Sequence, residues 1–455
     1  MKELEYKTEI CVVGLGPAGI GTAITFKEYN LLNNVLYLEI GNKPNDRYCS
    51  LLSNQICARE IPCQMISGFG GCSLLSGSKL SLLPAGGKLI DITGSKDLVE
   101  KSILKALEFF NKYLILKKPE IAIKDIIYAE NFFGSLGFKY KYYDAYLFNQ
   151  EELNQSYQKI YKNLKQSGAT ILLNTELIDV SCGERNFKLI AKKESRYINI
   201  IAKYLILGIG RLGKNLLRNL NIKLNLGGKE NFLDIGVRLE FPINLYQNIS
   251  KYHYDLKLLF NDARTFCVCS GGKVAHYLLN DIFFTEGYFN PIERTNFTNL
   301  GILIRLKPST ENELIIKEVV EKIIKTSSFK PLYQNLYEYL KNKNKNPKIN
   351  NFSSNSINYS QHVNLNKIFP RSINNKIKEA VTYFSNNLLK KSHFEEVNVF
   401  APELDYVSML FPVNTDFSIK PRIYLIGDCI GKFRGILQAF SSGVLCAENI
   451  INNKK

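Results

Sequence analysis

The sequence of 455 residues has no tryptophan, only four histidines and no C-x-x-C pair among its ten cysteines. Zinc knuckles and thioredoxin-like redox pairs both need closely paired cysteines, so neither kind of site is expected. The histidines lie far apart in the sequence, at none of the spacings that metal ligands use. We therefore expect no metal site and interpret the cysteines as reduced structural thiols.

Long apolar runs are also missing. No segment approaches the roughly 18 uninterrupted apolar residues that a membrane-spanning helix needs. The first residues, Met1 to Glu5, carry acid and lack the apolar segment of a secretory signal. A cytoplasmic protein without a membrane span is therefore expected. Its length exceeds what one hydrophobic core holds, which predicts two or three lobes.

The formal net charge is strongly positive, +17 at pH 7. Most of the basic residues are lysines, and Asn and Ile are also abundant, which is the bias of an AT-rich coding sequence. This bias explains the charge without selection for phosphate contacts, so a nucleic-acid partner is not expected. The segment 328–358 is rich in Lys, Asn and Ser and is interpreted as a solvated loop or insertion.

Near its start the chain contains a strand–turn–helix–strand pattern around the glycine-rich segment Gly14–Gly19. Residues 9–14 predict a buried strand, residues 17–29 a helix, and residues 35–40 a second strand with Glu39 near its end. This context turns a weak G-x-G-x-x-G match into a dinucleotide-binding fingerprint.

Each position of the fingerprint has a physical role. Gly14 permits the tight turn, Gly16 lets the backbone approach a pyrophosphate, and Gly19 lets helix and strand pack closely. The helix that follows presents unpaired N–H groups and the positive end of its dipole to the phosphates. Glu39 is placed to accept hydrogen bonds from the ribose hydroxyls.

A second pattern, near the C-terminus, favours FAD over NAD. Residues 423–428 form an apolar strand pattern that ends in Gly427-Asp428, and residues 435–452 predict a helix. FAD bound in an extended conformation needs a distant second site for its ribityl chain and flavin. Asp428 can accept a ribityl hydroxyl, and the helix N-terminus can stabilise negative charge at the flavin N1–C2=O edge. FAD is therefore the expected cofactor.

The rest of the chain predicts an α/β protein of several parts. Helical periodicity covers residues 97–113 and 150–167, and strand patterns cover residues 170–174, 176–201 and 204–208. Residues 213–393 mix both patterns and are typical of a separate lobe. The expected division is an FAD-binding domain of residues 1–95, 150–212 and 396–455, an insertion at 96–149, and a substrate or cap domain at 213–395.

Three internal stretches resemble a known group of flavoproteins. They are Gly68-Phe69-Gly70-Gly71-Cys72, Gly210-Arg211-Leu212-Gly213 and the segment Arg264–Gly272. With both termini, they are similar to the bacterial FAD-dependent dehydrogenases, which are NAD(P)/FAD-dependent oxidoreductases with two dinucleotide-binding folds. The resemblance implies a Rossmann-like FAD-binding domain of the glutathione reductase and p-hydroxybenzoate hydroxylase type, with an inserted α+β substrate domain.

The resemblance also implies roles for individual residues. Arg47 would lie near a phosphate, the backbone of Leu177 at the adenine, and the loop Gly68–Gly71 along the flavin. Asp428 would hold the ribityl chain, and residues 435–438 would border the isoalloxazine. The expected cofactor contacts are Gly14, Gly16, Pro17, Ala18, Gly19, Glu39, Arg47, Gly68, Gly70, Gly71, Leu177, Gly208, Gly210, Gly427, Asp428, Gly435, Ile436 and Gln438.

The chain departs from the pattern of this group at two places. Relatives usually carry an acid in the loop where this chain has Ser76-Gly77-Ser78-Lys79, so a candidate proton carrier is missing. Cys429 and Ile430 are larger than the residues that usually follow the Gly-Asp pair, and they would narrow the space beside the flavin.

Arg264 and Lys79 are the candidate catalytic residues. The guanidinium fork of Arg264 could bind a carboxylate bidentately, or it could close an ion pair within the substrate lobe. Lys79 could approach the flavin or a substrate carboxylate, or it could lie on the solvated surface. Cys267 and Cys269 would share one face of a strand and are interpreted as packing residues.

The leading hypothesis is an FAD-dependent dehydrogenase or reductase that transfers a hydride between flavin N5 and a small organic substrate. An FAD monooxygenase and a flavoprotein bound to RNA are the alternatives. The absence of tryptophan excludes the tryptophan-bearing motif of flavin halogenases, and no cysteine pair follows Glu39 as in dithiol disulfide reductases. No second complete fingerprint stands out, so either NAD(P)H binds transiently or another donor supplies electrons. Substrate and oligomeric state remain open.

Overall fold

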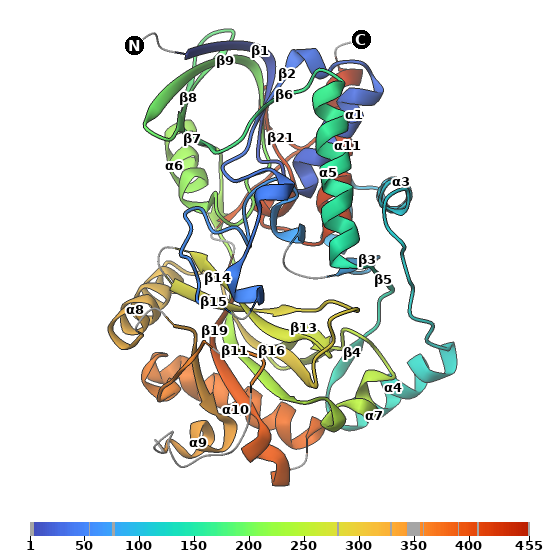
Figure 1. Ribbon diagram of the computed structural model, residues 1–455, viewed down its shortest axis with the longest axis vertical. Coiled ribbons are helices and arrows are strands. Elements are labelled where there is room, and N and C mark those ends of the chain that lie inside the picture. Colours follow the sequence, from blue (N-terminus) through green and yellow to red (C-terminus); the bar gives the residue numbers. More distant parts are fainter. Residues whose placement is uncertain are drawn as a thin grey trace.

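The chain folds into two lobes that are stacked along the long axis of the molecule (Figure 1), as described by a computed structural model. Each lobe has its own sheet and its own hydrophobic core. Both ends of the chain lie in the lobe at the top of Figure 1, which we call the first lobe. The structure describes residues 4–53, 55–74, 78–279, 282–327, 330–343, 355–357, 359–389, 391–406 and 409–453.

The first lobe is built on an eight-stranded sheet with the order β21-β22-β9-β1-β2-β6, and β7 and β8 continue from β9 as antiparallel neighbours. Strands β22, β9, β1, β2 and β6 run parallel to one another. All four residues of β2 are buried, as expected of a parallel strand covered on both faces. The strands are β1 (Leu4–Val13), β2 (Val35–Leu38), β6 (Thr170–Leu172), β7 (Thr175–Cys182), β8 (Phe187–Lys193), β9 (Arg196–Leu207), β21 (Ser418–Lys420) and β22 (Ile423–Leu425).

Two long helices, α1 (Pro17–Glu28) and α11 (Ile436–Asn452), lie side by side in this lobe (Figure 1). Glycines allow their close approach, because a Cβ at Gly21 would collide with the Phe440 carbonyl and one at Gly443 with the Ala18 carbonyl. Each helix follows a strand parallel to β9, so both begin at the same edge of the sheet. The other helices of the lobe are α2 (Ile90–Thr93), α3 (Lys96–Asn111), α5 (Gln150–Gln166) and α6 (Lys214–Leu224).

The second lobe is built on a ten-stranded, mostly antiparallel sheet with the order β14-β15-β19-β11-β16-β13-β12-β4, and β17 and β18 join it beside β19. Its strands are β4 (Lys139–Lys141), β11 (Leu233–Pro242), β12 (Lys257–Phe260), β13 (Ala263–Ser270), β14 (Lys273–Leu279), β15 (Ile282–Tyr288), β16 (Phe297–Leu306), β17 (Leu332–Asn335), β18 (Gln361–His362) and β19 (Asn398–Tyr406). Its helices are α4 (Ile123–Ser135), α7 (Gln247–Ser250), α8 (Glu311–Thr326), α9 (Leu336–Lys341) and α10 (Arg371–Leu388).

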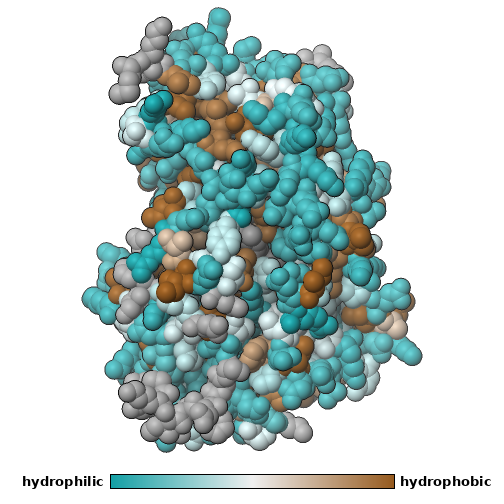
Figure 2. Space-filling model, viewed as in Figure 1, coloured by the Kyte–Doolittle hydropathy of each residue, from teal (hydrophilic) through white to brown (hydrophobic). Residues whose placement is uncertain are grey.

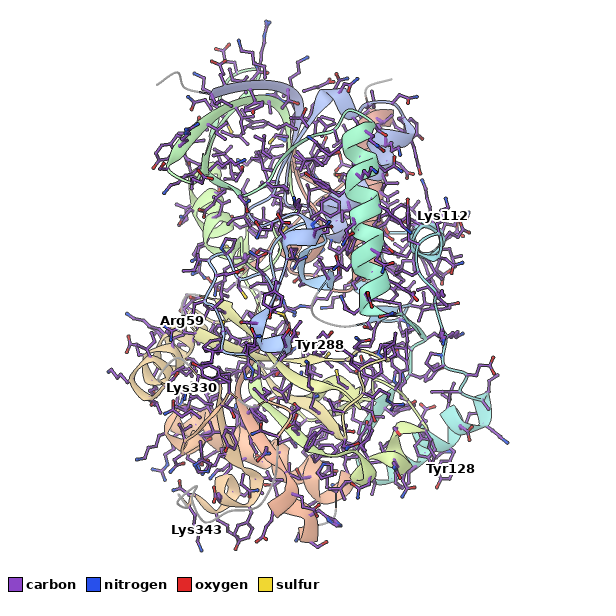
Figure 3. All side chains as sticks on the ribbon, in the orientation of Figure 1. Arg59, Lys112, Tyr128, Tyr288, Lys330 and Lys343 are labelled. Carbon is purple, nitrogen blue, oxygen red and sulfur yellow. The ribbon has the colours of Figure 1, made fainter. Side chains whose placement is uncertain are left out.

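Several segments join the two lobes. Two short antiparallel ladders pair β3 (Lys79–Ser81) with β5 (Ala145–Leu147), and β10 (Lys229–Glu230) with β20 (Met409–Leu410). The irregular segment after β2 also reaches the second lobe, where the Leu278 amide donates to Cys63 Sγ at 3.3 Å and Lys273 Nζ donates to the Leu52 carbonyl. Tyr288, at the end of β15, lies at this junction (Figure 3).

The predicted α/β class is confirmed, with a parallel sheet flanked by helices in the first lobe. Two boundaries differ from expectation. Helix α3 packs into the first core, where Phe109 stacks on Phe440 with 4.9 Å between ring centroids. Only α4 and β4, in the middle of 96–149, join the second lobe, because Phe148 packs in the first core again. Strand β19 belongs to the second sheet, so the chain returns to the first lobe after Tyr406 rather than at residue 396.

Within the described residues, no helix is both long enough and apolar enough to cross a bilayer. The face shown in Figure 2 is largely hydrophilic, with apolar residues in small separate groups. The stretch 328–358, predicted as a solvated loop, is described at residues 330–343, which form β17 and α9 with Leu336 and Tyr339 buried. Residues 328–329, 344–354 and 358 lie outside the described residues, as do Ser76 and Gly77 of the loop before β3.

Candidate functional site

The three glycines of the fingerprint differ in what surrounds them. Gly14 has a φ of +95°, and a Cβ there would collide with the Gly208 carbonyl at the end of β9. A Cβ at Gly19 would collide with the Gly14 carbonyl. A Cβ at Gly16 would meet only the Gly71 Cα, at 3.7 Å. Gly14 and Gly19 therefore allow the strand and helix to pack, whereas Gly16 borders open space.

Both long helices of the first lobe begin at a glycine. Gly16 is the N-cap of α1 and Gly435 is the N-cap of α11, and neither helix has a side-chain cap or an acidic residue in its first turn. Their first N–H groups are therefore available to another acceptor at the same edge of the sheet. Gly427 lies between the first turns of the two helices: its φ is +71°, and a Cβ there would lie 3.0 Å from Ala18 Cβ on α1 and 3.8 Å from Ala439 Cβ on α11.

Glu39 lies beside the fingerprint turn and is 4 % exposed. Its carboxylate accepts hydrogen bonds from the backbone N–H groups of Leu15 at 2.7 Å, Gly41 at 2.9 Å and Gly68 at 2.9 Å. The expected role was to accept from ribose hydroxyls. In the structure the carboxylate ties the fingerprint turn to the glycine loop, which comes 29 residues later.

Arg47 lies inside the same loop. Its guanidinium donates to the carbonyls of Phe69 at 2.9 Å and Gln64 at 2.6 Å, and burial lowers the pKa of Arg47 to about 10. The side chain is 5 % exposed, and its Nε makes no hydrogen bond with the described residues. Arg47 therefore holds the backbone of the glycine loop through hydrogen bonds to its carbonyls, beside the turn expected to bind the pyrophosphate.

The glycine loop packs against the fingerprint turn. The Gly70 amide donates to the Leu15 carbonyl at 2.8 Å, and a Cβ at Gly71 would lie 3.0 Å from Gly16 Cα. On its other side, a Cβ at Gly70 would lie 2.7 Å from the ring of Tyr157 on α5. Expected to lie along the flavin, the loop is found beside the turn expected to bind the pyrophosphate.

Leu177 is buried on β7, close to Glu39. The Thr175 amide donates to the Glu39 carbonyl at 2.9 Å, and the pairing of β7 with β8 shifts register between Leu177 and Asp179. Gly208 lies at the end of β9, next to Gly14, and a Cβ at Gly210 would meet no atom within 4 Å. Leu177, expected at the adenine, thus lies near the end of β2, and Gly208 lies beside the fingerprint turn.

Asp428, expected at the ribityl chain, lies between two arginines. Its carboxylate oxygens are 3.6 Å from Arg211 Nε and 3.3 Å from Arg434 Nε. Burial raises the pKa of Asp428, and the charge of Arg211 opposes that rise. Asp428 Oδ1, the oxygen that faces Arg434 Nε, makes no hydrogen bond with the described residues.

These two arginines also reach acids of the second lobe. Arg211 Nη1 lies 3.4 Å from Glu286 on β15, and Arg434 forms an ion pair with Asp405 on β19. Burial, Arg211 and Arg264 together lower the pKa of Arg434 well below its usual range. The junction therefore brings arginines and acids into close contact, Arg211 and Arg434 with Asp428, Glu286 and Asp405.

Arg264 belongs to the second-lobe side of this junction. Its Nη2 lies 2.6 Å from Asp234 and 2.5 Å from Asp405, and Arg305 binds the same Asp234 at 2.8 Å. Of the two alternatives for Arg264, its contacts match the ion pair within the second lobe. Both acids come from strands far away in the sequence, so no local pattern marked them.

Gln438 fixes the start of α11 to the junction. Its Nε2 donates to the carbonyls of Ser81 at 2.9 Å and Ala85 at 2.9 Å, and its Oε1 makes no hydrogen bond with the described residues. A Cβ at Gly435 would collide with this Oε1. Ile436, the first helical residue, is partly buried against the first core. The residues expected at the isoalloxazine are thus tied to β3.

Lys79, on β3, is buried rather than solvated. Its Nζ lies 2.7 Å from Asp255 Oδ2 and 3.7 Å from Cys267 Sγ. Burial lowers the pKa of Lys79, but Asp255, through its charge and hydrogen bond, together with Cys267 and Cys269 raises it well above its usual range. Tyr143 also donates to Asp255 Oδ2, at 2.7 Å. No local pattern in the sequence marks Asp255 as the partner of Lys79.

A small pocket opens on the junction beside Arg211. Its wall combines two cationic side chains with apolar ones: Arg211, Lys214, Tyr277, Leu279, Phe284, Ile316 and Leu404. Arg211 lies in a motif that the sequence singled out, whereas Arg434 was missed although it directly precedes Gly435. No group of histidine, cysteine and acidic side chains suited to a metal ion occurs in the described parts of the chain.

No family model matches the chain, and no curated protein matches it. Solved structures similar to it include a flavoprotein/dehydrogenase from Cytophaga hutchinsonii, at 10% identity over 98% of this chain and 79% of that chain, with a TM-score of 0.42. Another is p-nitrophenol 4-monooxygenase from Pseudomonas putida DLL-E4, at 10% identity, 98% and 79% coverage and a TM-score of 0.39. A geranylgeranyl bacteriochlorophyll reductase-like protein from Thermoplasma acidophilum has 11% identity, 99% and 80% coverage and a TM-score of 0.39. All three TM-scores are below 0.5.

Proposed function

We propose that the chain is an FAD-dependent oxidoreductase, and more specifically a dehydrogenase or reductase acting on a small organic substrate at the junction between the lobes. The observation that carries this proposal is the meeting of two uncapped helix N-termini, at Gly16 and Gly435, along one edge of a parallel sheet. Two anionic regions of one extended ligand would be stabilised there, the pyrophosphate at α1 and the flavin at α11.

The residues present fit FAD. Open space at Gly16 suits a pyrophosphate, because a substituent there meets only the Gly71 Cα at 3.7 Å. Asp428 Oδ1, which makes no hydrogen bond with the described residues although Arg434 Nε lies 3.3 Å away, suits a ribityl hydroxyl, and Gln438 Oε1 offers a second acceptor near α11. Glu39 holds the turn and the glycine loop in register through its three backbone hydrogen bonds. When bound, FAD supplies hydride transfer at N5.

The junction also indicates the kind of substrate. The pocket beside Arg211 pairs cationic Arg211 and Lys214 with an apolar wall that includes Tyr277 and Phe284. A small molecule with an acidic group and an apolar body would satisfy both features. Arg211 would orient the acidic group, while the apolar wall would exclude water from the rest of the substrate. NAD(P)H is proposed as a transient electron donor.

A monooxygenase is the second candidate, because the arginine-rich junction would serve an acidic aromatic substrate equally well. Rapid mixing of the reduced holoprotein with oxygen separates the two. A dehydrogenase predicts immediate reoxidation, whereas a long-lived oxygenated absorbance would favour a monooxygenase.

The visible spectrum of the purified protein tests the cofactor. We expect one FAD per chain in the wild type and its loss in Gly16→Val, whose branched side chain would fill the space beside Gly71. Gly134→Ala on α4 is the matched control, since a Cβ there meets no atom within 4 Å. A wild-type protein that stays colourless after FAD is added would refute the proposal.

A further inference from the structure

Strand β13 contains an irregularity at two of its cysteines. Its pairing with β16 shifts register between Phe266 and Cys269, and Cys267 has a φ of +43°, a left-handed conformation that is rare for a residue with a side chain. In a regular strand, alternate residues lie about 6.6 Å apart. Here Cys267 Sγ and Cys269 Sγ are 4.0 Å apart. The bulge therefore turns two neighbouring side chains into a close pair of sulfurs.

Buried side chains hold this unusual backbone on both sides. Arg238 Nη1 donates to the Cys267 carbonyl at 2.9 Å, and the next amide, of Val268, donates to Asp255 Oδ1 at 2.8 Å. Arg238 is fully buried and is itself fixed by Glu403, at 2.9 Å from its Nε. The left-handed conformation of Cys267 is a backbone outlier fixed by hydrogen bonds from buried side chains, and such outliers point to a functional role.

The two thiols have different surroundings. Cys267 is partly exposed, and Lys79 Nζ lies 3.7 Å from its sulfur. The hydrogen bond from Cys269 lowers the pKa of Cys267, burial opposes this, and the Lys79 charge lowers it further, whereas Glu286 and Asp255 act against it. Cys269 is buried, and the hydrogen bond to Cys267 raises its pKa well above the usual range. Cys267 is thus a partly exposed thiol beside a cation, whereas Cys269 is a buried thiol next to it.

The structure leaves room for the sulfurs to meet. Gly287 on β15 faces Cys269, and a Cβ at Gly287 would lie 2.8 Å from Cys269 Sγ. With no side chain at Gly287, Cys269 Sγ can lie under the bulge. Closing the gap from 4.0 Å to the roughly 2.05 Å of a disulfide needs side-chain rotation and a small movement of the bulge.

We propose that Cys267 and Cys269 form a redox-active dithiol whose substrate is a small-molecule disulfide. The Cys267 thiolate attacks one sulfur of the substrate, forming a mixed disulfide and releasing the first thiolate. Cys269 then loses its proton to the medium and attacks Cys267 Sγ, which closes the intramolecular disulfide and releases the second thiolate. The two cysteines are oxidised by two electrons and the substrate is reduced to two thiols. No flavin takes part in this exchange.

Full-length protein without added FAD, incubated with glutathione disulfide, tests the proposal. After alkylation with iodoacetamide and digestion, the peptide spanning both residues should be unalkylated and lighter by two hydrogen atoms than its dithiol form. Cys269→Ser should stop at a glutathione adduct on Cys267, and Cys267→Ser should form no disulfide. The exposed Cys182 is the internal control, expected to keep any adduct it forms.

Two results would overturn the pair: a wild type in which both thiols stay alkylatable, or one that retains the adduct on Cys267 as Cys269→Ser does. Thermal melting of each variant shows whether it is folded, and serine closely matches the size of cysteine.

The role of Lys79 is tested by the rate of iodoacetamide reaction at Cys267 near pH 7. Lys79→Met should slow this reaction about tenfold, the effect of one pKa unit on the thiolate fraction. Lys79→Arg keeps a cation beside the sulfur and should restore most of the rate. Equal rates in all three proteins would show that Lys79 does not activate the thiol.

Discussion

The interiors of the two lobes are stabilised in different ways. In the first lobe, glycines let backbone approach backbone, and the buried Glu39 carboxylate is stabilised by hydrogen bonds from three backbone N–H groups. In the second lobe, buried side chains of opposite charge form ion pairs, Arg238 with Glu403 and Arg264 with Asp234. The first arrangement depends on main-chain geometry and the second on pairs of side chains, so substitutions should act differently in each.

The largest effect is expected at Arg238, which is fully buried. Arg238→Met leaves the Glu403 carboxylate buried without its partner and should lower the free energy of unfolding by about 3–5 kcal/mol. Urea titration followed by circular dichroism measures this. The double variant Arg238→Met/Glu403→Leu should recover much of the loss because no unpaired charge remains. If the free energy of unfolding of Arg238→Met lies within about 1 kcal/mol of the wild-type value, ion pairing does not stabilise the second lobe as proposed.

A smaller effect is expected in the first lobe at Glu39. Glu39→Gln replaces one acceptor oxygen by an NH₂ group that faces backbone donors, which should cost about 1.5–3 kcal/mol of unfolding free energy. Glu176→Gln, on the exposed face of β7, is the matched control and should change stability by less than about 0.5 kcal/mol. If the two variants melt at the same temperature, the carboxylate does not hold the turn and loop together.

A third effect, a dependence of stability on pH, belongs to the second lobe. Burial lowers the pKa of His276 to about 3, with the Arg238 charge adding to the shift. Since the unfolded value is about 6.5, protonation favours the unfolded chain, and stability falls as pH drops below about 6.5 by up to about 1.4 kcal/mol per pH unit. The loss should level off near pH 3.

Comparing His276→Gln with the wild type isolates this contribution. Burial raises the pKa of Glu240 to about 7, so the contribution of Glu240 to the free energy of unfolding is lost as pH rises, opposite to that of His276. Glu240 is present in both proteins, so this contribution cancels in the comparison. The difference in unfolding free energy should therefore shrink between pH 6.5 and 4. A difference that does not change with pH would show that His276 is not held neutral by burial.

The contrast between the lobes also explains what could be predicted from the sequence. The fingerprint turn and both long helices follow from local patterns, and α11 was predicted within one residue of its observed start at Ile436. The partners of Arg238 and Arg264 could not be predicted, because Glu403 lies 165 residues from Arg238 and Asp405 lies 141 residues from Arg264. The same holds for the three donors to Glu39, one of which comes from Gly68.

The close approach of Cys267 and Cys269 could not be predicted from the sequence for a different reason. The spacing of Cys267 and Cys269 correctly placed both on one strand, but a regular strand would keep the sulfurs apart. The bulge that brings them to 4.0 Å depends on Arg238 and Asp255, and neither is marked by the sequence around β13.

The central claim is that one FAD spans two half-sites, at α1 and α11, and calorimetric titration with FAD and with ADP tests it most directly. Gly16→Val should weaken the binding of both ligands, because both use the pyrophosphate turn. Asp428→Ala should weaken FAD at least tenfold and leave ADP unchanged, because only FAD reaches the second half-site. If Asp428→Ala weakens both ligands equally, or neither, the two-half-site account is contradicted.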